Sequence, residues 1–126
     1  MILTHIEQIK GKMINQGQEN ERLIKLIASP RSAIFRDSFG CGMTIMPPGH
    51  VHEPHQHEMN EELIYVVSGS GEAEIGGQTL QITAGNIISL DRNELHRFVN
   101  TGTDELRLLW IYSPSGAEVR FADTEP

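Results

Sequence analysis

The sequence predicts an all-β fold, and three observations support that prediction. From about Arg22 onward, short runs of β-branched and other apolar residues alternate with breaks rich in glycine, proline, asparagine and aspartate. The runs recur every eight to twelve residues, a spacing typical of a sandwich, barrel or jelly roll. No helical pattern of ten residues separates the runs, which disfavours a parallel α/β fold.

The expected strands follow one another in chain order. They span residues 23–28, 33–35, 43–46, 63–67, 72–75, 79–82, 87–90, 96–100 and 106–112. The clearest turn is Gly76-Gly77, because two adjacent glycines supply the positive φ angles that a tight hairpin turn requires. We therefore expect a hairpin between the strands over 72–75 and 79–82.

The segment before the first expected strand has two alternative interpretations. Its apolar residues could form one face of a helix: Ile2, Ile6, Ile9 and Met13. Gly11 and Gly17 weaken that pattern, so an edge strand or an irregular cover is an equal alternative. We expect a single domain over residues 1–126, divided into a cover segment (1–21), a barrel (22–113) and a loose tail (114–126).

The composition is that of one small soluble domain. The chain has 126 residues, of which 38% are hydrophobic, and a chain of this size can build one core without disulfide bonds. Its net charge is -7, from 10 Lys and Arg against 17 Asp and Glu. A negative field repels phosphate backbones and anionic lipids, so neither nucleic acid nor a membrane is expected as a partner.

The chain is expected in the cytoplasm. The lone Cys41 excludes an intramolecular disulfide and a multi-cysteine zinc cluster, and it suits a reducing compartment. Glu7 and Lys10 interrupt the apolar run that a signal peptide would need near the N-terminus. No stretch approaches the length of about eighteen apolar residues that is needed to span a bilayer.

Histidine is the one residue type that stands out. Five of the six histidines lie in the middle of the chain: His50, His52, His55, His57 and His96. His55 and His57 are two residues apart, so an extended backbone directs both imidazoles to one face. Residues 58–61 are long enough to turn the chain and bring Glu62 to the same point, so one hairpin could supply three ligands. His96 opens another expected strand and would complete a set of three imidazoles and one carboxylate, which suits Fe, Mn, Ni, Cu or Zn.

The same residues resemble the sequence motifs of the cupin family. The first motif, G-x5-H-x-H-x3,4-E-x6-G, is met in full by Gly49, His55, His57, Glu62 and Gly69. The second motif, G-x5-P-x-G-x2-H-x3-N, is met by Gly85, His96 and Asn100, with Asp91 in place of proline and Asn93 in place of glycine. Both departures lie in the turn before the histidine, where Asp and Asn tolerate turn conformations much as glycine does.

The resemblance implies a fold, a cofactor and an assembly. The fold would be a double-stranded β-helix, the cupin jelly-roll barrel, with one divalent metal ion in its lumen. The metal ligands would be His55, His57, Glu62 and His96. Family members of this length are often dimers, so a homodimer is the expected assembly.

The resemblance leaves the reaction open, because one barrel supports many chemistries. A metal-dependent enzyme acting on a small molecule is the main expectation. Dioxygenase-like chemistry is slightly favoured, since three imidazoles and a carboxylate can hold a redox-active metal with open positions. A non-redox isomerase, lyase or decarboxylase acting on a sugar or a carboxylate is the first alternative. A non-catalytic binding or sensor protein is the second.

Strand alternation identifies candidate pocket residues beside the ligands. Counting from Glu62, it directs Ile64 and Val66 to the side of the carboxylate. Counting from His96, it directs Phe98 to the side of the imidazole. These positions suit either the wall of a pocket or ordinary core packing.

The last expected strand presents two different faces. Trp110 and Tyr112 share one face and Arg107 lies on the other. Arg107 in the lumen would favour a carboxylate or phosphate substrate, whereas Trp110 and Tyr112 there would favour a sugar or an aromatic ring. His50 and His52 either line the mouth of the pocket or face solvent, and an imidazole that titrates near neutrality can transfer protons. The candidate catalytic residues are therefore His50, His52, Arg107 and Tyr112, and Trp110 joins the candidate pocket wall.

Overall fold

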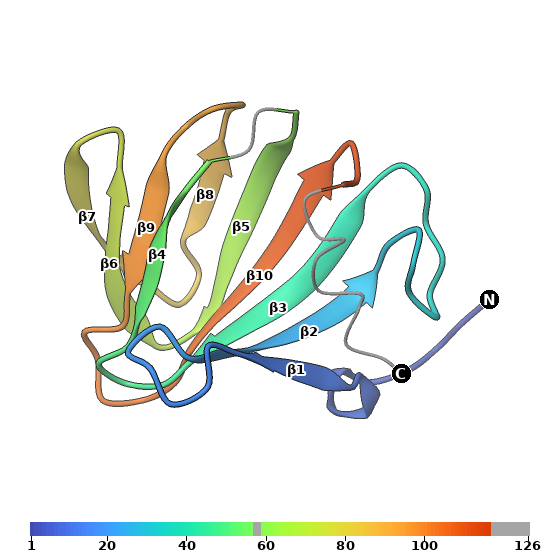
Figure 1. The fold of residues 1–126 in the computed structure, drawn as a ribbon, viewed down its shortest axis with the longest axis horizontal. Coiled ribbons are helices and arrows are strands. Elements are labelled where there is room, and N and C mark those ends of the chain that lie inside the picture. The colour runs from blue at the N-terminus through green and yellow to red at the C-terminus, as the bar shows by residue number, and fades with distance from the viewer. Residues whose placement is uncertain (57–58, 117–126) are drawn as a thin grey trace.

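The computed structural model describes residues 1–56 and 59–116 and consists mainly of strands (Figure 1). The strands are β1 (Gly11–Ile14), β2 (Arg22–Ala28), β3 (Gly40–Met46), β4 (Val51–His55), β5 (Glu61–Ser68), β6 (Ser70–Ile75), β7 (Gln78–Thr83), β8 (Ile87–Leu90), β9 (His96–Val99) and β10 (Leu106–Ser113). The helical part of these residues is the short 3-10 turn η1 (Ile6–Gln8), and none of the described helical structure is long and apolar enough to cross a membrane. The all-β prediction is confirmed.

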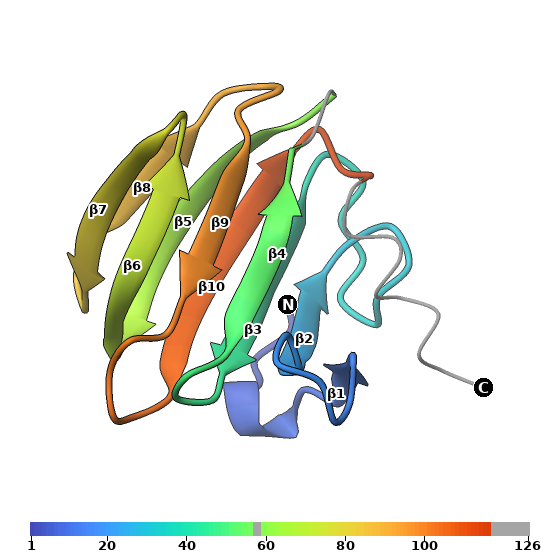
Figure 2. The same ribbon diagram turned by 60° about the vertical axis from the view of Figure 1, so that its left-hand side comes forward.

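The strands form two antiparallel sheets that face each other across a common interior. The larger sheet has the order β1-β2-β3-β10-β5-β8, and the smaller sheet has the order β4-β9-β6-β7. In the turned view of Figure 2, β4, β9 and β6 lie in front of β3, β10 and β5. Strands that are distant in the chain are neighbours in space, as β3 and β10 show by pairing along their length. This is the topology of a jelly-roll barrel.

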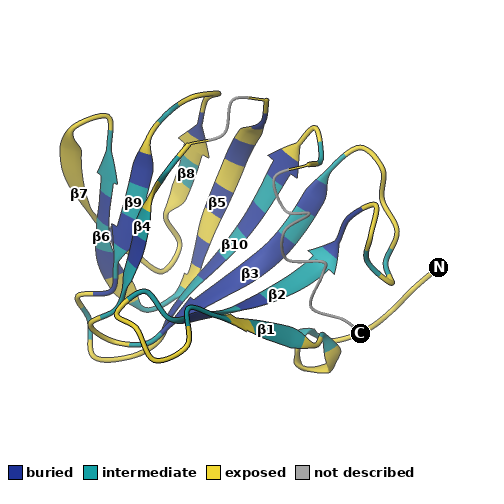
Figure 3. Ribbon diagram, viewed as in Figure 1, coloured by how far each residue is buried: buried dark blue, intermediate teal, exposed yellow. Residues whose placement is uncertain are grey.

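Alternation along the strands fills the interior with apolar side chains. In β5, Glu62, Ile64 and Val66 are buried while Leu63 and Tyr65 between them are exposed, which gives the striped strand in Figure 3. The buried residues of β10 are Leu106, Leu108, Trp110 and Tyr112. The smaller sheet contributes Ala73, Ile82 and Phe98. The core therefore lies between the two sheets.

The hairpin predicted at Gly76-Gly77 is confirmed. β6 and β7 pair in register from Ser70 opposite Thr83 to Ile75 opposite Gln78. The two glycines between them have φ angles of 56° and 83°. Positive φ at both central residues is the requirement of the tight turn that matches the twist of a hairpin.

Two other predictions for the N-terminal third have different outcomes. Of the alternatives for the first segment, an edge strand is observed, because β1 pairs with β2 at the end of the larger sheet. The strand expected over residues 33–35 is wrong, since Phe35 makes only a single bridge, to Ser29. These residues lie in a loop that the Ser29 and Ser32 hydroxyls close by a hydrogen bond of 2.8 Å. A run of three apolar residues inside such a loop is too short to extend the sheet.

The hairpin expected to carry three metal ligands is also wrong. β4 pairs with β9 in the smaller sheet, whereas β5 pairs with β10 and β8 in the larger sheet. The chain therefore passes from one sheet to the other between β4 and β5. Because the two sheets face each other, side chains of β4 and β5 approach from opposite walls of the barrel.

Gly69, in the tight link from β5 to β6, is expected to be far less replaceable than Gly77. Both have positive φ, 88° and 83°, but a Cβ at Gly69 would run into the carbonyl oxygen of Glu105 and lie 2.9 Å from Cα of Leu106, whereas a Cβ at Gly77 meets open space. We expect Gly69→Ala to lower the free energy of unfolding by about 2–5 kcal/mol, from strain and overpacking together. Gly77→Ala carries the strain alone, about 1–2 kcal/mol.

Urea unfolding of both variants and of the wild type measures this difference. Equal destabilisation by the two alanines would contradict the close packing of the β5–β6 link against β10.

Candidate metal centre

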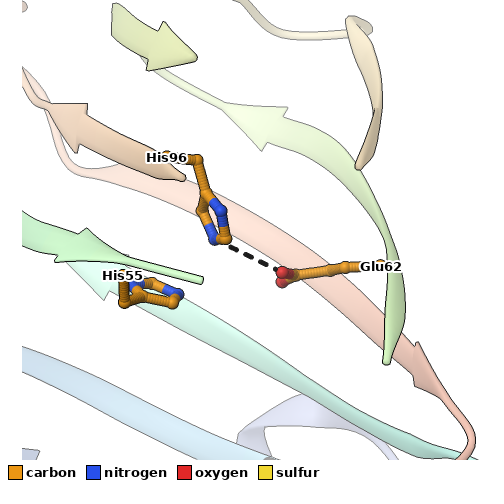
Figure 4. Close-up of side chains that lie close together, drawn as sticks. All are labelled: His55, Glu62 and His96. Carbon is orange, nitrogen blue, oxygen red and sulfur yellow. Dashed lines mark ion pairs between the residues drawn. The ribbon is translucent and has the colours of Figure 1, made fainter. Parts of the chain in front are cut away.

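Three side chains from three strands converge in the interior of the barrel. His55 is the last residue of β4, His96 is the first residue of β9, and Glu62 lies near the start of β5. One ligand atom from each lies within 4.8 Å of the others. His55 and His96 are register partners in the smaller sheet, and Glu62 reaches them from the larger sheet. Figure 4 shows the three side chains pointing toward one another.

An irregularity in β4 brings a further histidine to the same place. The register between β4 and β9 shifts between His52 and His55. Residues three apart on a regular strand point to opposite faces, but the shift leaves His52 buried, with its ring centroid 4.2 Å from that of His55. Pro54 lies in the irregular stretch, where its missing N–H does not interrupt a regular ladder.

Backbone carbonyl groups orient the two histidines of this group. Nδ1 of His96 lies 2.9 Å from the carbonyl oxygen of Glu94, and Nδ1 of His55 lies 3.3 Å from that of Glu53. A carbonyl oxygen only accepts hydrogen bonds, so each Nδ1 is the donor and carries the proton. The Nε2 atoms then present their lone pairs, which is the arrangement commonly found in metal-binding histidines.

The separation between ligand atoms fits a shared cation. Nε2 of His96 lies 3.4 Å from Oε1 of Glu62, as the dashed line in Figure 4 marks. Two atoms bound to one ion at about 2.1 Å each are separated by roughly 3.0–3.4 Å at bond angles of about 90–110°. Glu62 and His96 are both buried, and a cation between them would offset the cost of burying the carboxylate. The donor set therefore fits a divalent metal.

The other residue expected to bind the metal, His57, lies outside the described residues. The glycine that ends the first motif, Gly69, forms the link between β5 and β6. In the second motif, Asn93 stands where glycine is usual and has a φ of 65°, a conformation that asparagine tolerates better than most residues. Asn100 is buried and donates to the carbonyl oxygens of Met46 and Asp104 at 2.9 Å each, so it supports the loop before β10.

The ligands open onto a narrow lumen. Its lining residues are Arg22, Ile24, Thr44, His52, His55, Glu62, Ile64, Phe98, Leu108, Trp110 and Tyr112. The empty volume is about 370 Å³ including the open mouth, and only a small part of it is enclosed. The enclosed part therefore suits only a few atoms.

Most of the candidate pocket residues line the lumen. Ile64, Phe98, Trp110 and Tyr112 line the lumen together with His52. Val66 is fully buried in the core but does not line the lumen. Of the two faces of β10, the one with Trp110 and Tyr112 looks inward, and Nε1 of Trp110 donates to Oγ1 of Thr44 at 2.9 Å.

The remaining two candidates lie outside the lumen. Arg107 is on the outer face of β10, where it forms an ion pair of 3.0 Å with Glu105. His50 precedes β4 in a turn, and its Nδ1 lies 3.2 Å from the carbonyl oxygen of Pro48. Neither residue is among those that line the lumen beside His55, Glu62 and His96.

Arg22 also lines the lumen, although no sequence motif identified it as a candidate site residue. It is the first residue of β2 and only 2% exposed. Its guanidinium group binds both oxygens of Glu53, at 3.1 and 3.2 Å. Partial burial acts to raise the pKa of Glu53, but the hydrogen bonds and charge of Arg22, with a further bond from Asn20, hold that pKa below its ordinary value. Strand alternation could have indicated its inward position, because Arg22 lies two residues before the buried Ile24 and so shares a face with it.

Comparison with known proteins gives one family match and several relatives. Residues 42–112, more than half of the chain, match a family model described as Cupin domain. The chain is 36% identical over 73 residues to the polyketide synthase CurC of Streptomyces cyaneus, which covers 58% of this chain and 47% of that protein. It is 32% identical over 95 residues to the L-ectoine synthase of Vibrio atlanticus, which covers 72% and 74%. The chain spans between about half and two thirds of the length of the first curated relatives it matches.

The fold is also found in solved structures. The crystal structure of a protein from Thermotoga maritima, described as a predicted oxalate decarboxylase, superposes with a TM-score of 0.79. The match covers 90% of this chain and 99% of that chain, at 23% sequence identity. At that identity the likeness shows the shared fold alone.

Replacing Glu62 by glutamine is expected to weaken divalent metal binding by about tenfold or more, because a neutral amide oxygen is a poorer ligand than a carboxylate. The matched control is Glu61→Gln, since Glu61 is the neighbouring carboxylate but is exposed. Both variants and the wild type would be stripped with a chelator and titrated calorimetrically with Zn²⁺, with circular dichroism as the check on folding. Zinc affinity that is the same for Glu62→Gln and the wild type would overturn the assignment of the ligand.

Proposed function

The chain belongs to the cupin domain family, and from that membership we propose that it is a metal-dependent enzyme acting on a small organic molecule. One divalent ion would be held by His55, Glu62 and His96, the three residues that converge in the interior. His57 would be the fourth ligand, as the first motif implies. The ion would be Fe, Mn, Ni, Cu or Zn, all of which accept imidazole and carboxylate ligands.

The observation that carries this proposal is the convergence of the three ligand atoms within 4.8 Å inside the barrel. Isolated histidines on strands are ordinarily structural. Here two imidazoles whose Nδ1 atoms face backbone carbonyls meet a buried carboxylate from the opposite sheet. That combination supports a metal site more strongly than either motif does alone.

A divalent ion bound there would supply Lewis acidity toward a carbonyl or carboxylate oxygen of the substrate. The side chains of the lumen have three other tasks in this proposal. Ile64, Phe98 and Trp110 exclude water from the site, which strengthens its electrostatic interactions. His52 lies beside His55 and can give a proton to the substrate or take one from it. The small enclosed volume limits the substrate to a few atoms beyond the ligands.

Of the chemistries expected from the residues, we propose the non-redox one. The relatives described above are named as synthases and as a decarboxylase, and none of those names describes an oxygenase. This support is by analogy, because one fold serves many reactions. Dioxygenase-like chemistry is the second candidate, since the donor set can also hold a redox-active metal.

The assembly and compartment expected from the sequence are part of the same proposal. A homodimer follows from the likeness to small family members, and a cytoplasmic location follows from the single cysteine. Light scattering on the purified protein measures the first, and fractionation of the native host measures the second.

Turnover is expected to require a metal and to proceed without dioxygen. Chelator-treated protein would be reloaded with one metal at a time and incubated with a panel of short carboxylates and carbonyl compounds, under nitrogen and in air. Nuclear magnetic resonance would follow loss of each compound, and an oxygen electrode would follow oxygen uptake. Turnover only in air would favour the dioxygenase, and saturable binding without turnover would favour a non-catalytic binding protein.

His52→Gln is expected to lower kcat by about 100-fold while leaving zinc affinity unchanged, because it removes a proton-transfer group and not a ligand. The matched control is His5→Gln, since His5 is exposed and caps η1 far along the chain from the motifs. Rates would be measured with the compound that the panel identifies. A kcat in His52→Gln equal to that of the control would contradict the proposed proton transfer.

A further inference from the structure

The fold leaves two hydrogen-bond donors of Arg22 unused among the described residues. Nη1 donates to the carbonyl oxygen of Asn20 at 3.1 Å and to Oε2 of Glu53 at 3.2 Å, and Nη2 donates to Oε1 of Glu53 at 3.1 Å. A guanidinium group has five N–H donors in a fixed plane. The two that remain are Nε–H and the second N–H of Nη2, which lie side by side on one edge of that plane. Nε is fully buried and has no hydrogen-bond partner among the described residues.

The unused edge has the shape of a carboxylate-binding site. Two parallel N–H groups match the two oxygens of a carboxylate, and such bidentate pairs are among the stronger hydrogen-bonded contacts in proteins. A buried donor without a partner is destabilising, so an arginine kept in that state inside a lumen indicates a ligand that completes it. Arg22 lines the same lumen as His55 and Glu62.

The ion pair with Glu53 does not by itself account for the burial of Arg22. Glu53 is 41% exposed, so its carboxylate stays partly solvated and offsets only part of the cost of burying the guanidinium group. Glu53 occupies the end of the guanidinium group and thereby fixes its orientation. That arrangement leaves free the side-on edge, which carries Nε–H and the second N–H of Nη2.

We propose that Arg22 binds the carboxylate of the substrate through this side-on edge, and that the substrate is a short carboxylate with a second oxygen for the metal. This inference rests on the proposed function, because the metal is the second point of attachment. Arg22 and a divalent ion carry three positive charges against the two negative charges of Glu53 and Glu62, so the loaded lumen attracts an anion. The narrow lumen favours a small anion over a large one.

The test uses pyruvate as the probe and pyruvamide as its neutral counterpart of the same shape. Nitrogen-15-labelled, zinc-loaded protein would be titrated with each compound while the arginine Nε–H signals are observed. The Arg22 signal is assigned in the wild type by triple-resonance experiments on protein that is also labelled with carbon-13. Pyruvate is expected to move this signal downfield, and pyruvamide is expected to leave it in place, because only the carboxylate accepts both hydrogen bonds.

Calorimetry on variants gives the second measurement. Arg22→Lys keeps the positive charge but loses the two parallel N–H donors. Its affinity for pyruvate is therefore expected to fall about tenfold or more. The matched control is Arg107→Lys, since Arg107 is also paired with a glutamate but lies outside the lumen, and its affinity is expected to stay within about twofold of the wild type. Zinc content is expected to be the same in all three proteins.

Three results would overturn the inference. They are an Arg22 signal that saturating pyruvate leaves unmoved, no binding of pyruvate by the wild type at millimolar concentrations, and equal pyruvate affinity in Arg22→Lys and the wild type. The first needs no variant and so does not depend on the folding of Arg22→Lys. Loss of zinc binding in the wild type would instead overturn the proposed function, and the titration of Arg22 in metal-free protein would still test the carboxylate site.

Discussion

The site depends on one buried contact between the two sheets, that of His96 on β9 with Glu62 on β5. Both side chains lie where the apolar core would otherwise continue, with Ile64 and Phe98 beside them along the same strands. Removal of these polar groups from water makes their interaction strong but also costly unless a proton or a cation joins them. The passage of the chain from the smaller to the larger sheet after β4 is what sets a carboxylate against imidazoles across the interior.

The bulge in β4 links this contact to the rest of the lumen. It turns His52 and His55 inward, and between them lies Glu53, which reaches across to Arg22 on β2. The two sheets are therefore joined by two polar bridges, His96 with Glu62 and Arg22 with Glu53. His55 is held to the carbonyl of the same Glu53 that orients the guanidinium group. The positions of His55 and Arg22 thus depend on one short stretch of backbone.

Much of this arrangement could be predicted from the sequence, because its signals are local. Period-two alternation identified Ile64 and Phe98 as inward-facing, and motif spacing brought together His55, Glu62 and His96 despite their separation in the chain. What the sequence could not show depends on pairing between distant strands. Strict alternation fails for His52, because a register shift re-aims it, and local pattern cannot tell a hairpin from a crossing between sheets at β4 and β5. Arg22 reads as the polar start of an apolar strand until β2 is seen to form part of the lumen wall.

Arg22 and the candidate metal ligands come from different parts of the chain. His55, Glu62 and His96 lie within the stretch that matches the family model, residues 42–112, while Arg22 precedes it on a strand next to the edge of the larger sheet. Mutation at Arg22 would therefore alter the lumen from outside the stretch that carries the family motifs, while Glu53 couples the position of Arg22 to that of His55.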